Sequence, residues 1–183
     1  MQDKKLLKTA LSLSHKKKYR EALAYLQEAQ KKGNAEATYA LANWYHYGRA
    51  VKKDEKKSIQ LLKKAVALKH PEACRVFAGY LEQGKGIKKN IKAALKLYKI
   101  SLKAGNKSSA FEIARLYYYG IGVRKDFEQA RSYALKAARC GDEEAYRMLG
   151  VMYKNGEGVT KSRSRSEFWY KRVSGKSSGP TKK

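Results

Sequence analysis

The sequence predicts an all-α protein, built as an α/α solenoid of helix-turn-helix repeats with a 36-residue period. Three observations support this prediction: glycine-containing turns recur at a constant interval, apolar residues on both sides of each turn follow helical spacing, and helix-capping residue types precede each expected second helix. Only two prolines occur in 183 residues, so little interrupts helix formation.

The turns set the period. Short segments such as Tyr117–Val123 contain a glycine, a variable residue, a second glycine and an apolar residue. The first glycine recurs every 36 residues, at Gly48, Gly84, Gly120 and Gly156. The second glycine is replaced only in the first copy, by Ala50.

A first helix precedes each turn. Its residues at i, i+4, i+5 and i+8 form one apolar face, with small side chains that allow close approach and large ones that fill the space between helices. These four columns are Ala37/Ala73/Ser109/Ala145, Leu41/Phe77/Ile113/Leu149, Ala42/Ala78/Ala114/Gly150 and Tyr45/Leu81/Tyr117/Tyr153.

A second helix follows each turn. The expected N-cap residues are Asp54, Asn90, Asp126 and Ser162, whose side-chain oxygens can accept from the first free N–H groups of a helix. A second apolar stripe follows, and Gly105 and Gly141 fit a left-handed helix end. In the last copy, Phe168, Trp169 and Tyr170 are either core of the final hairpin or a surface for a second copy.

The chain therefore divides into three parts. Residues 1–34 form an N-terminal helical hairpin of tetratricopeptide type, with Leu26 and Ala29 in second-helix register. Residues 35–173 form four repeats, and residues 174–183 form a polar, basic tail that we expect to be disordered.

The pattern A-x3-L-A/G-x2-Y-x2-G-x-G-V-x2-D, followed by an alanine-rich helix, resembles the Sel-one-like repeat family, which is related to the tetratricopeptide repeats. The resemblance covers roughly residues 35 to 173, and the copy with Gly120, Val123 and Asp126 matches best. It implies a right-handed solenoid that acts as a scaffold or adaptor and has no chemistry of its own.

The residues themselves also argue against catalysis. Gly120-Ile121-Gly122 lacks the third glycine of a dinucleotide loop, and a helix rather than a strand precedes it. The three histidines are scattered, and two cysteines exclude a dense disulfide framework. Glu143 and Glu144 are expected to complement a helix dipole. We expect no enzyme, no cofactor and no metal site.

A binding groove is the alternative to chemistry. By analogy with tetratricopeptide arrays, the first helices line the concave face, where aromatic residues alternate with arginines. This face would bind an acidic protein or peptide, with guanidinium groups pairing carboxylates. For Tyr118 and Tyr119, covering a neighbouring repeat is an equal alternative. The predicted partner-binding residues are Tyr39, Asn43, Arg75, Phe111, Arg115, Tyr118 and Arg147.

The charge of the chain points to a second kind of partner. The 42 Lys plus Arg residues against 16 Asp plus Glu give a formal net charge of +26, which favours association with polyanions. Nucleic-acid binding is therefore the alternative function, with anionic lipid as a weaker third. The lysines expected on the convex face to bind a polyanion are Lys56, Lys57, Lys92, Lys96 and Lys99.

The N-terminus bears on location. Lysines interrupt every apolar run in the first 20 residues, so we expect no secretion signal and no membrane span. A cytoplasmic location follows, or a periplasmic or secreted one if a leader has been removed. The oligomeric state stays open.

Overall fold

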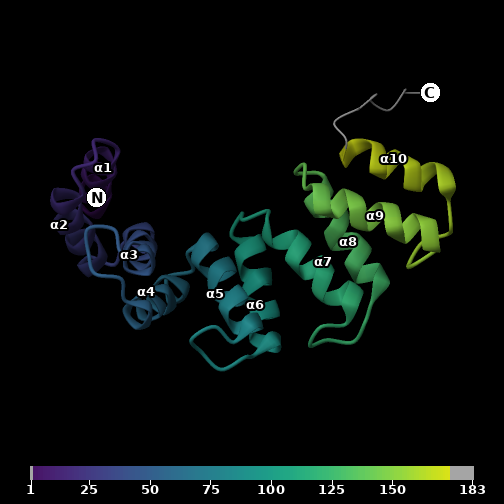
Figure 1. Ribbon diagram of the computed structural model, residues 1–183, viewed down its shortest axis with the longest axis horizontal. Coiled ribbons are helices and arrows are strands. Elements are labelled where there is room, and N and C mark those ends of the chain that lie inside the picture. Colours follow the sequence, from purple (N-terminus) through teal and green to yellow (C-terminus); the bar gives the residue numbers. More distant parts are fainter. Residues whose placement is uncertain (1, 174–183) are drawn as a thin grey trace. The chain divides into compact units, whose positions relative to one another are not determined.

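The structure of the protein is a computed structural model that describes residues 2–173, and in this range it contains ten α-helices and no strand. The helices pack in chain order as five hairpins, α1 with α2 through α9 with α10 (Figure 1). The all-α repeat fold expected from the sequence is confirmed. The helices are α1 (Gln2–His15), α2 (Tyr19–Lys31), α3 (Ala35–Tyr47), α4 (Glu55–Ala67), α5 (Pro71–Gln83), α6 (Ile91–Lys103), α7 (Ser109–Tyr119), α8 (Phe127–Ala138), α9 (Glu143–Asn155) and α10 (Arg163–Val173).

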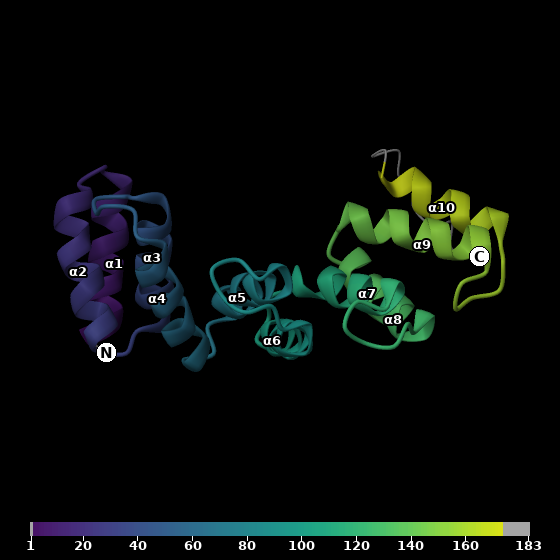
Figure 2. The same ribbon diagram turned by 60° about the horizontal axis from the view of Figure 1, so that its bottom comes forward.

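The hairpins belong to two compact units. The first unit is Met1–Gly105 and contains α1 to α6, and the second is Asn106–Lys183 and contains α7 to α10. Within the first unit α2 packs on α3 and α4 on α5, and within the second α8 packs on α9 (Figure 2). The tail expected to be disordered, 174–183, lies outside the described residues.

The four turns that join α3 to α4, α5 to α6, α7 to α8 and α9 to α10 have the same backbone geometry, whereas the turn from α1 to α2 contains no glycine. The glycine after the first helix is left-handed in every copy, with φ between 69° and 81° at Gly48, Gly84, Gly120 and Gly156. The N–H of the residue that caps the second helix then donates back to the first helix. Asp54 N donates to Tyr45 O at 2.9 Å, and Asp126 N donates to Tyr117 O at 3.0 Å. The turn therefore fixes one helix against the other.

The predicted caps of the second helices are confirmed. The side chains of Asp54, Asn90 and Asp126 accept from the backbone N–H three residues later at 2.9 to 3.0 Å. Ser162 makes the same bond to Arg165 N at 3.3 Å. Each of these bonds satisfies a donor that a helix start otherwise leaves unpaired.

Two left-handed positions of the repeat containing α3 and α4 are not glycine. Ala50 has φ 56° where the other copies have Gly86, Gly122 and Gly158, and Lys69 has φ 57° in the column of Gly33, Gly105 and Gly141. The Cβ of an L-residue meets steric cost in this region. Two residues of this repeat therefore have a backbone conformation that costs free energy, whereas the equivalent positions named above are glycine.

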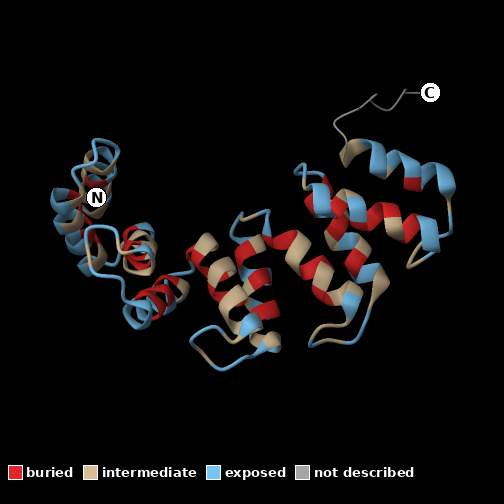
Figure 3. Ribbon diagram, in the orientation of Figure 1, coloured by how far each residue is buried: buried red, intermediate tan, exposed pale blue. Residues whose placement is uncertain are grey.

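Small residues let the paired helices approach. The columns headed by Ala37 and Ala42 are buried throughout, and buried residues line the facing sides of each hairpin (Figure 3). Two hairpins add a hydrogen bond at this contact: Ser58 Oγ donates to Ala42 O and Ser166 Oγ to Gly150 O, both at 2.8 Å. The serines that interrupt the alanine column thus satisfy a carbonyl of the facing helix.

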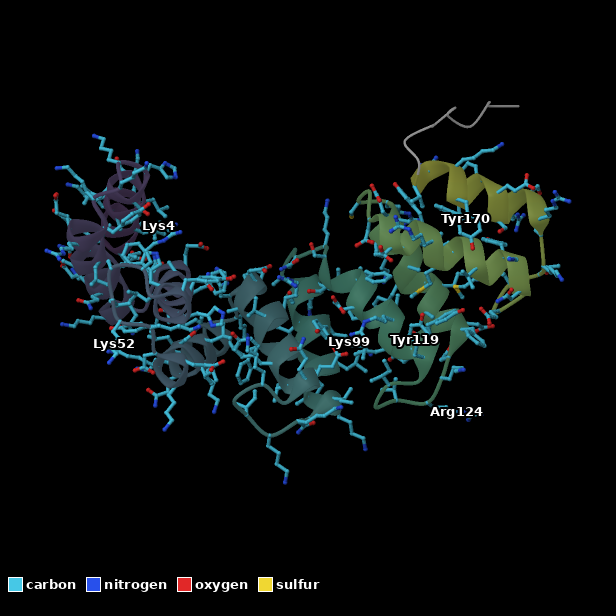
Figure 4. The ribbon with its side chains drawn as sticks, viewed as in Figure 1. Lys4, Lys52, Lys99, Tyr119, Arg124 and Tyr170 are labelled. Carbon is cyan, nitrogen blue, oxygen red and sulfur yellow. The ribbon has the colours of Figure 1, made fainter. Side chains whose placement is uncertain are left out.

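The aromatic residues of α10 pack within the final hairpin. Trp169 stacks on Tyr146 with 5.9 Å between ring centroids. The ring of Tyr170 lies so close to Gly150 that a Cβ there would meet it at 2.8 Å (Figure 4). Trp169 and Tyr170 thus contact α9, but Phe168 and Tyr170 remain 38% and 39% exposed, so a surface for a second copy stays a prediction.

The caps of the first helices show one unusual residue. Asn34 and Asp142 cap α3 and α9, and the residue in the same column before α5 is His70. His70 Nδ1 accepts from Ala73 N at 3.1 Å, and its Nε2 lies 2.8 Å from Glu36 Oε2. The buried imidazole therefore caps α5 and joins it to α3.

We expect Ala50→Gly to stabilise the protein by about 0.5–1 kcal/mol, because relief of the left-handed strain exceeds the added entropy of the unfolded chain. The matched change Gly158→Ala should destabilise by more than about 1 kcal/mol, since φ is 64° and a Cβ would meet the Phe127 backbone at 2.8 Å. Urea unfolding followed by circular dichroism measures both, and a lower midpoint for Ala50→Gly would contradict the argument.

His70→Ala is expected to lower the free energy of unfolding by about 1 kcal/mol more than His70→Asn does. Both substitutions remove the imidazole contacts with Glu36 and Tyr39, but asparagine restores a capping oxygen, as Asn34 does on α3. The difference between the two variants in urea unfolding isolates the cap. Equal stability would show that His70 acts only through its ring contacts.

Candidate interaction surface

The residues predicted to bind a partner all lie on first helices, but they are divided between the two units. Tyr39 and Asn43 are on α3 and Arg75 is on α5, in the first unit. Phe111, Arg115 and Tyr118 of α7 and Arg147 of α9 are in the second unit. Each unit therefore contains its own set of these residues.

The second unit brings its four residues together around one hollow of about 340 Å³ between α7 and α9. Phe111 and Met148 supply apolar surface, and Arg115 and Arg147 supply guanidinium groups. Tyr119, whose side chain is 60% exposed, stands at the end of α7 (Figure 4). The full lining is Phe111, Arg115, Tyr118, Tyr119, Glu144, Arg147, Met148 and Val151.

Both arginines of the hollow are paired with glutamates of their own helix. Arg115 Nε and Nη2 donate to Glu112 Oε2 at 3.2 and 3.1 Å. Arg147 pairs with Glu144, and its Nη2 lies 3.4 Å from Glu143 Oε2. These pairs hold the guanidinium groups in place and balance their charge, so the hollow is far less basic than the chain as a whole.

The columns of aromatic residues and arginines in the sequence do not by themselves predict these glutamates as partners of the arginines. A Glu three residues before an Arg lies beside it on a helix, so this spacing is the signal that identifies the pairs. Glu143 and Glu144 do stand in the first turn of α9, where a dipole role was expected, and they also hold Arg147.

The two neighbouring tyrosines differ sharply. Tyr118 Oη donates to Glu157 Oε2 at 2.6 Å, and its ring meets Phe127 edge-on at 5.4 Å, so its side chain joins the turn after α9 to α8. Burial, and then the bond to Glu157, raises the pKa of Tyr118 far above its ordinary value. Tyr119 remains largely exposed. Packing between repeats therefore explains Tyr118 and leaves Tyr119 facing solvent.

The first unit has a related surface on α3 and α5. Tyr39 stacks on His70 at 4.7 Å between ring centroids. Burial raises the pKa of Tyr39, and Asn43 and Arg75 are near enough to act in the opposite direction. Arg75 Nε donates to Glu72 Oε1 at 3.0 Å, which repeats the Glu–Arg pairing of the second unit.

The five lysines predicted to bind a polyanion are exposed and lie on second helices of the first unit. Lys56 and Lys57 are on α4, and Lys92, Lys96 and Lys99 are on α6. Lys57 Nζ lies 4.4 Å from the centroid of the Tyr45 ring, and a side-chain hydrogen bond with Tyr45 raises the pKa of this lysine. The lysines thus occupy helices other than those of the arginine surfaces.

Within residues 2–173, no three His, Cys, Asp or Glu side chains gather as metal ligands would. No helix in this range has the length and the apolar character of a membrane span.

Together the fold and these surfaces define a helical-repeat protein of the tetratricopeptide-related class. The model of the Sel1 repeat family matches residues 12–34, 35–70, 71–106, 107–142 and 143–172. The chain belongs to the Sel1 repeat family. Proteins of this family generally mediate protein–protein interactions and are typically not enzymes.

Solved structures agree with this assignment. A Sel1 repeat protein from Oxalobacter formigenes is 25% identical with a TM-score of 0.83, over 94% of this chain and 72% of that one. A protective antigen of uropathogenic Escherichia coli with an SLR fold is 25% identical with a TM-score of 0.79, over 86% of this chain and 34% of that one. Cysteine rich protein B of Helicobacter pylori is 27% identical with a TM-score of 0.52, over 68% and 94%. A search of curated protein sequences finds no match.

We expect Tyr118→Phe to lower the free energy of unfolding near neutral pH by about 1 kcal/mol through loss of the bond to Glu157. The raised pKa means that the folded state keeps the phenol proton at a pH where the unfolded chain has lost it. This stabilisation is complete below about pH 10 and falls as the pH rises further. Tyr118→Phe should therefore lose less stability than the wild type between about pH 9 and pH 11 in urea unfolding. Parallel losses would contradict the assignment.

Proposed function

We propose that this protein is a non-enzymatic adaptor that binds a segment of an acidic partner protein in the hollow between α7 and α9. The observation that supports this most directly is the combination of aromatic and apolar side chains, of which Tyr119 is largely exposed, with two ion-paired arginines around one concavity. Aromatic residues and arginine are the types that contribute most binding energy at protein interfaces.

The lining favours a partner segment with an apolar side chain next to a carboxylate. Phe111, Met148 and Val151 offer apolar contact for the first group, and Arg115 and Arg147 offer N–H donors for the second. A guanidinium has five donors in a fixed fork, so one that already pairs with a carboxylate of its own helix can engage a further carboxylate.

The glutamates improve such a site rather than blocking it. A free arginine loses rotamer entropy when it binds, at about 0.5–1.5 kcal/mol for a side chain of this kind. Glu112 and Glu144 hold Arg115 and Arg147 before any partner arrives. The pairing also makes the site selective between partner segments. A segment that offers only carboxylates is repelled by the nearby glutamates, which have the same charge.

We propose the surface of Tyr39, Asn43 and Arg75 as a second contact region in the first unit. It repeats the aromatic residue and the Glu–Arg pair of the hollow. Its role is separable, since it lies in the other unit.

Arg147→Ala and Tyr119→Ala are each expected to weaken peptide binding about tenfold, which is the effect of losing a contact worth about 1.4 kcal/mol. The probe is a set of fluorescent peptides selected on the full-length protein from a random display library. Fluorescence anisotropy gives the dissociation constants. We expect the selected peptides to combine an apolar residue with Asp or Glu.

Tyr47→Ala is the matched control. Tyr47 occupies the position of Tyr119 in another repeat and is 76% exposed, but it is not part of the hollow. It should leave binding unchanged. If Tyr47→Ala weakens binding as much as Tyr119→Ala, or if neither Tyr119→Ala nor Arg147→Ala has an effect, the hollow is not the binding site.

A further inference from the structure

The segment from Gln83 to Gly105, which contains α6, has a composition unlike the rest of the chain. It contains seven lysines and no Asp or Glu in 23 residues. The other second helices, α2, α4, α8 and α10, each contain at least one glutamate. The excess positive charge of the first unit, with 25 Lys plus Arg against 8 Asp plus Glu, is therefore most one-sided here.

The lysines of α6 share one side of the helix. Lys92, Lys96, Lys99 and Lys103 are spaced by four, three and four residues, which is helical spacing, and all four are exposed. At a rise of 1.5 Å per residue they extend over about 16 Å of the helix. Lys88 and Lys89, also exposed, precede the helix directly.

This arrangement does not help α6 to fold. Like charges three or four residues apart repel on a helix, and Lys92 stands near the positive end of the helix dipole. The first turn of α6 contains no acidic residue to offset this. Within residues 2–173, Lys92, Lys96 and Lys103 make no ion pair. The lysine face is therefore explained by a contact outside the fold rather than by stability.

We propose that the α6 lysine face, formed by Lys88, Lys89, Lys92, Lys96 and Lys103, binds the phosphate backbone of double-stranded nucleic acid without reading its sequence. Lysines act as point charges toward phosphate, and over about 16 Å a duplex presents about ten phosphates. The face offers no aromatic side chain on which unpaired bases could stack, because Tyr98 is buried.

A membrane surface fits this face less well. An interfacial helix buries its apolar side in the lipid. The apolar side of α6, with Ala94, Leu95 and Tyr98, is already buried within the first unit. Ile100, at 43% exposed, is the one large apolar residue of α6 that is exposed, and Ile91, Leu97 and Leu102 are half-buried. An acidic protein would also need anchoring aromatic residues or arginines, which the face lacks.

The test measures binding of a fluorescent duplex DNA to the full-length protein over a range of salt concentrations. The triple variant Lys92→Gln, Lys96→Gln, Lys103→Gln should reduce the slope of log affinity against log salt by about 2.7, which is 0.9 for each lost phosphate contact. At about 0.1 M salt the affinity should fall at least tenfold.

The control removes the same charge elsewhere in the same unit. Lys4, Lys5 and Lys8 are exposed on α1, and their triple change to Gln should alter the slope by less than about one. Equal effects of the two triple variants would overturn the proposal, because net charge alone would then explain binding. Tighter binding to single strands than to duplex, or to phosphatidylserine vesicles than to either, would also overturn it.

Lys96→Glu separates binding from folding. It replaces the repulsion of Lys96 by Lys92 and Lys99 with attraction, so it should raise the thermal unfolding midpoint. The affinity for duplex DNA should fall by more than in Lys96→Gln. A variant that is more stable but binds less tightly excludes unfolding as the cause. If Lys96→Glu binds duplex as tightly as the wild type, the α6 lysine face is not the site.

Discussion

The backbone hydrogen bond that joins the first and second helix in each of the four hairpins from α3 to α10 is the constraint on which the other features depend. A left-handed glycine ends the first helix, and the N–H of the next cap residue returns to a carbonyl on that helix, as in Asp126 to Tyr117. With both helices fixed at the turn, small residues such as Ala42 and Ala78 can pack closely. The same hydrogen bond decides which residues of each helix remain on the surface.

Two kinds of surface result, and they differ in chemistry. The first helices α5, α7 and α9 present arginines that are paired with glutamates, as in Arg115 with Glu112. The second helices expose lysines, and α6 contains no Asp or Glu in its own sequence. A formal charge of +26 is therefore not spread evenly, since the second unit has 17 Lys plus Arg against 8 Asp plus Glu and the first has 25 against the same number. Among the helices of the first unit, the second helices α4 and α6 have the largest excess of positive charge.

The fold could be predicted because its signals are local and repeated. Hydrogen bonds between residues far apart in the sequence could not be predicted in this way. The left-handed Gly120 and the cap Asp126 followed from turn and cap chemistry within a few residues. The bond from Tyr118 to Glu157 joins residues 39 apart, and the capping role of His70 uses a residue type rarely found there. The predicted partner-binding residues all lie on first helices, as their periodicity indicates, but periodicity does not show that they are divided between two compact units.

The repeated turn also means that the length of this protein can change by one whole repeat at a time. Equivalent bonds recur 36 residues apart, from Asp54 N to Tyr45 O and from Asn90 N to Leu81 O. Duplication or loss of a whole 36-residue block joins equivalent positions and preserves every such bond, whereas a shorter insertion shifts the cap away from its carbonyl. Evolution can therefore change the number of surfaces in a Sel1 chain in whole units, without redesigning any one of them.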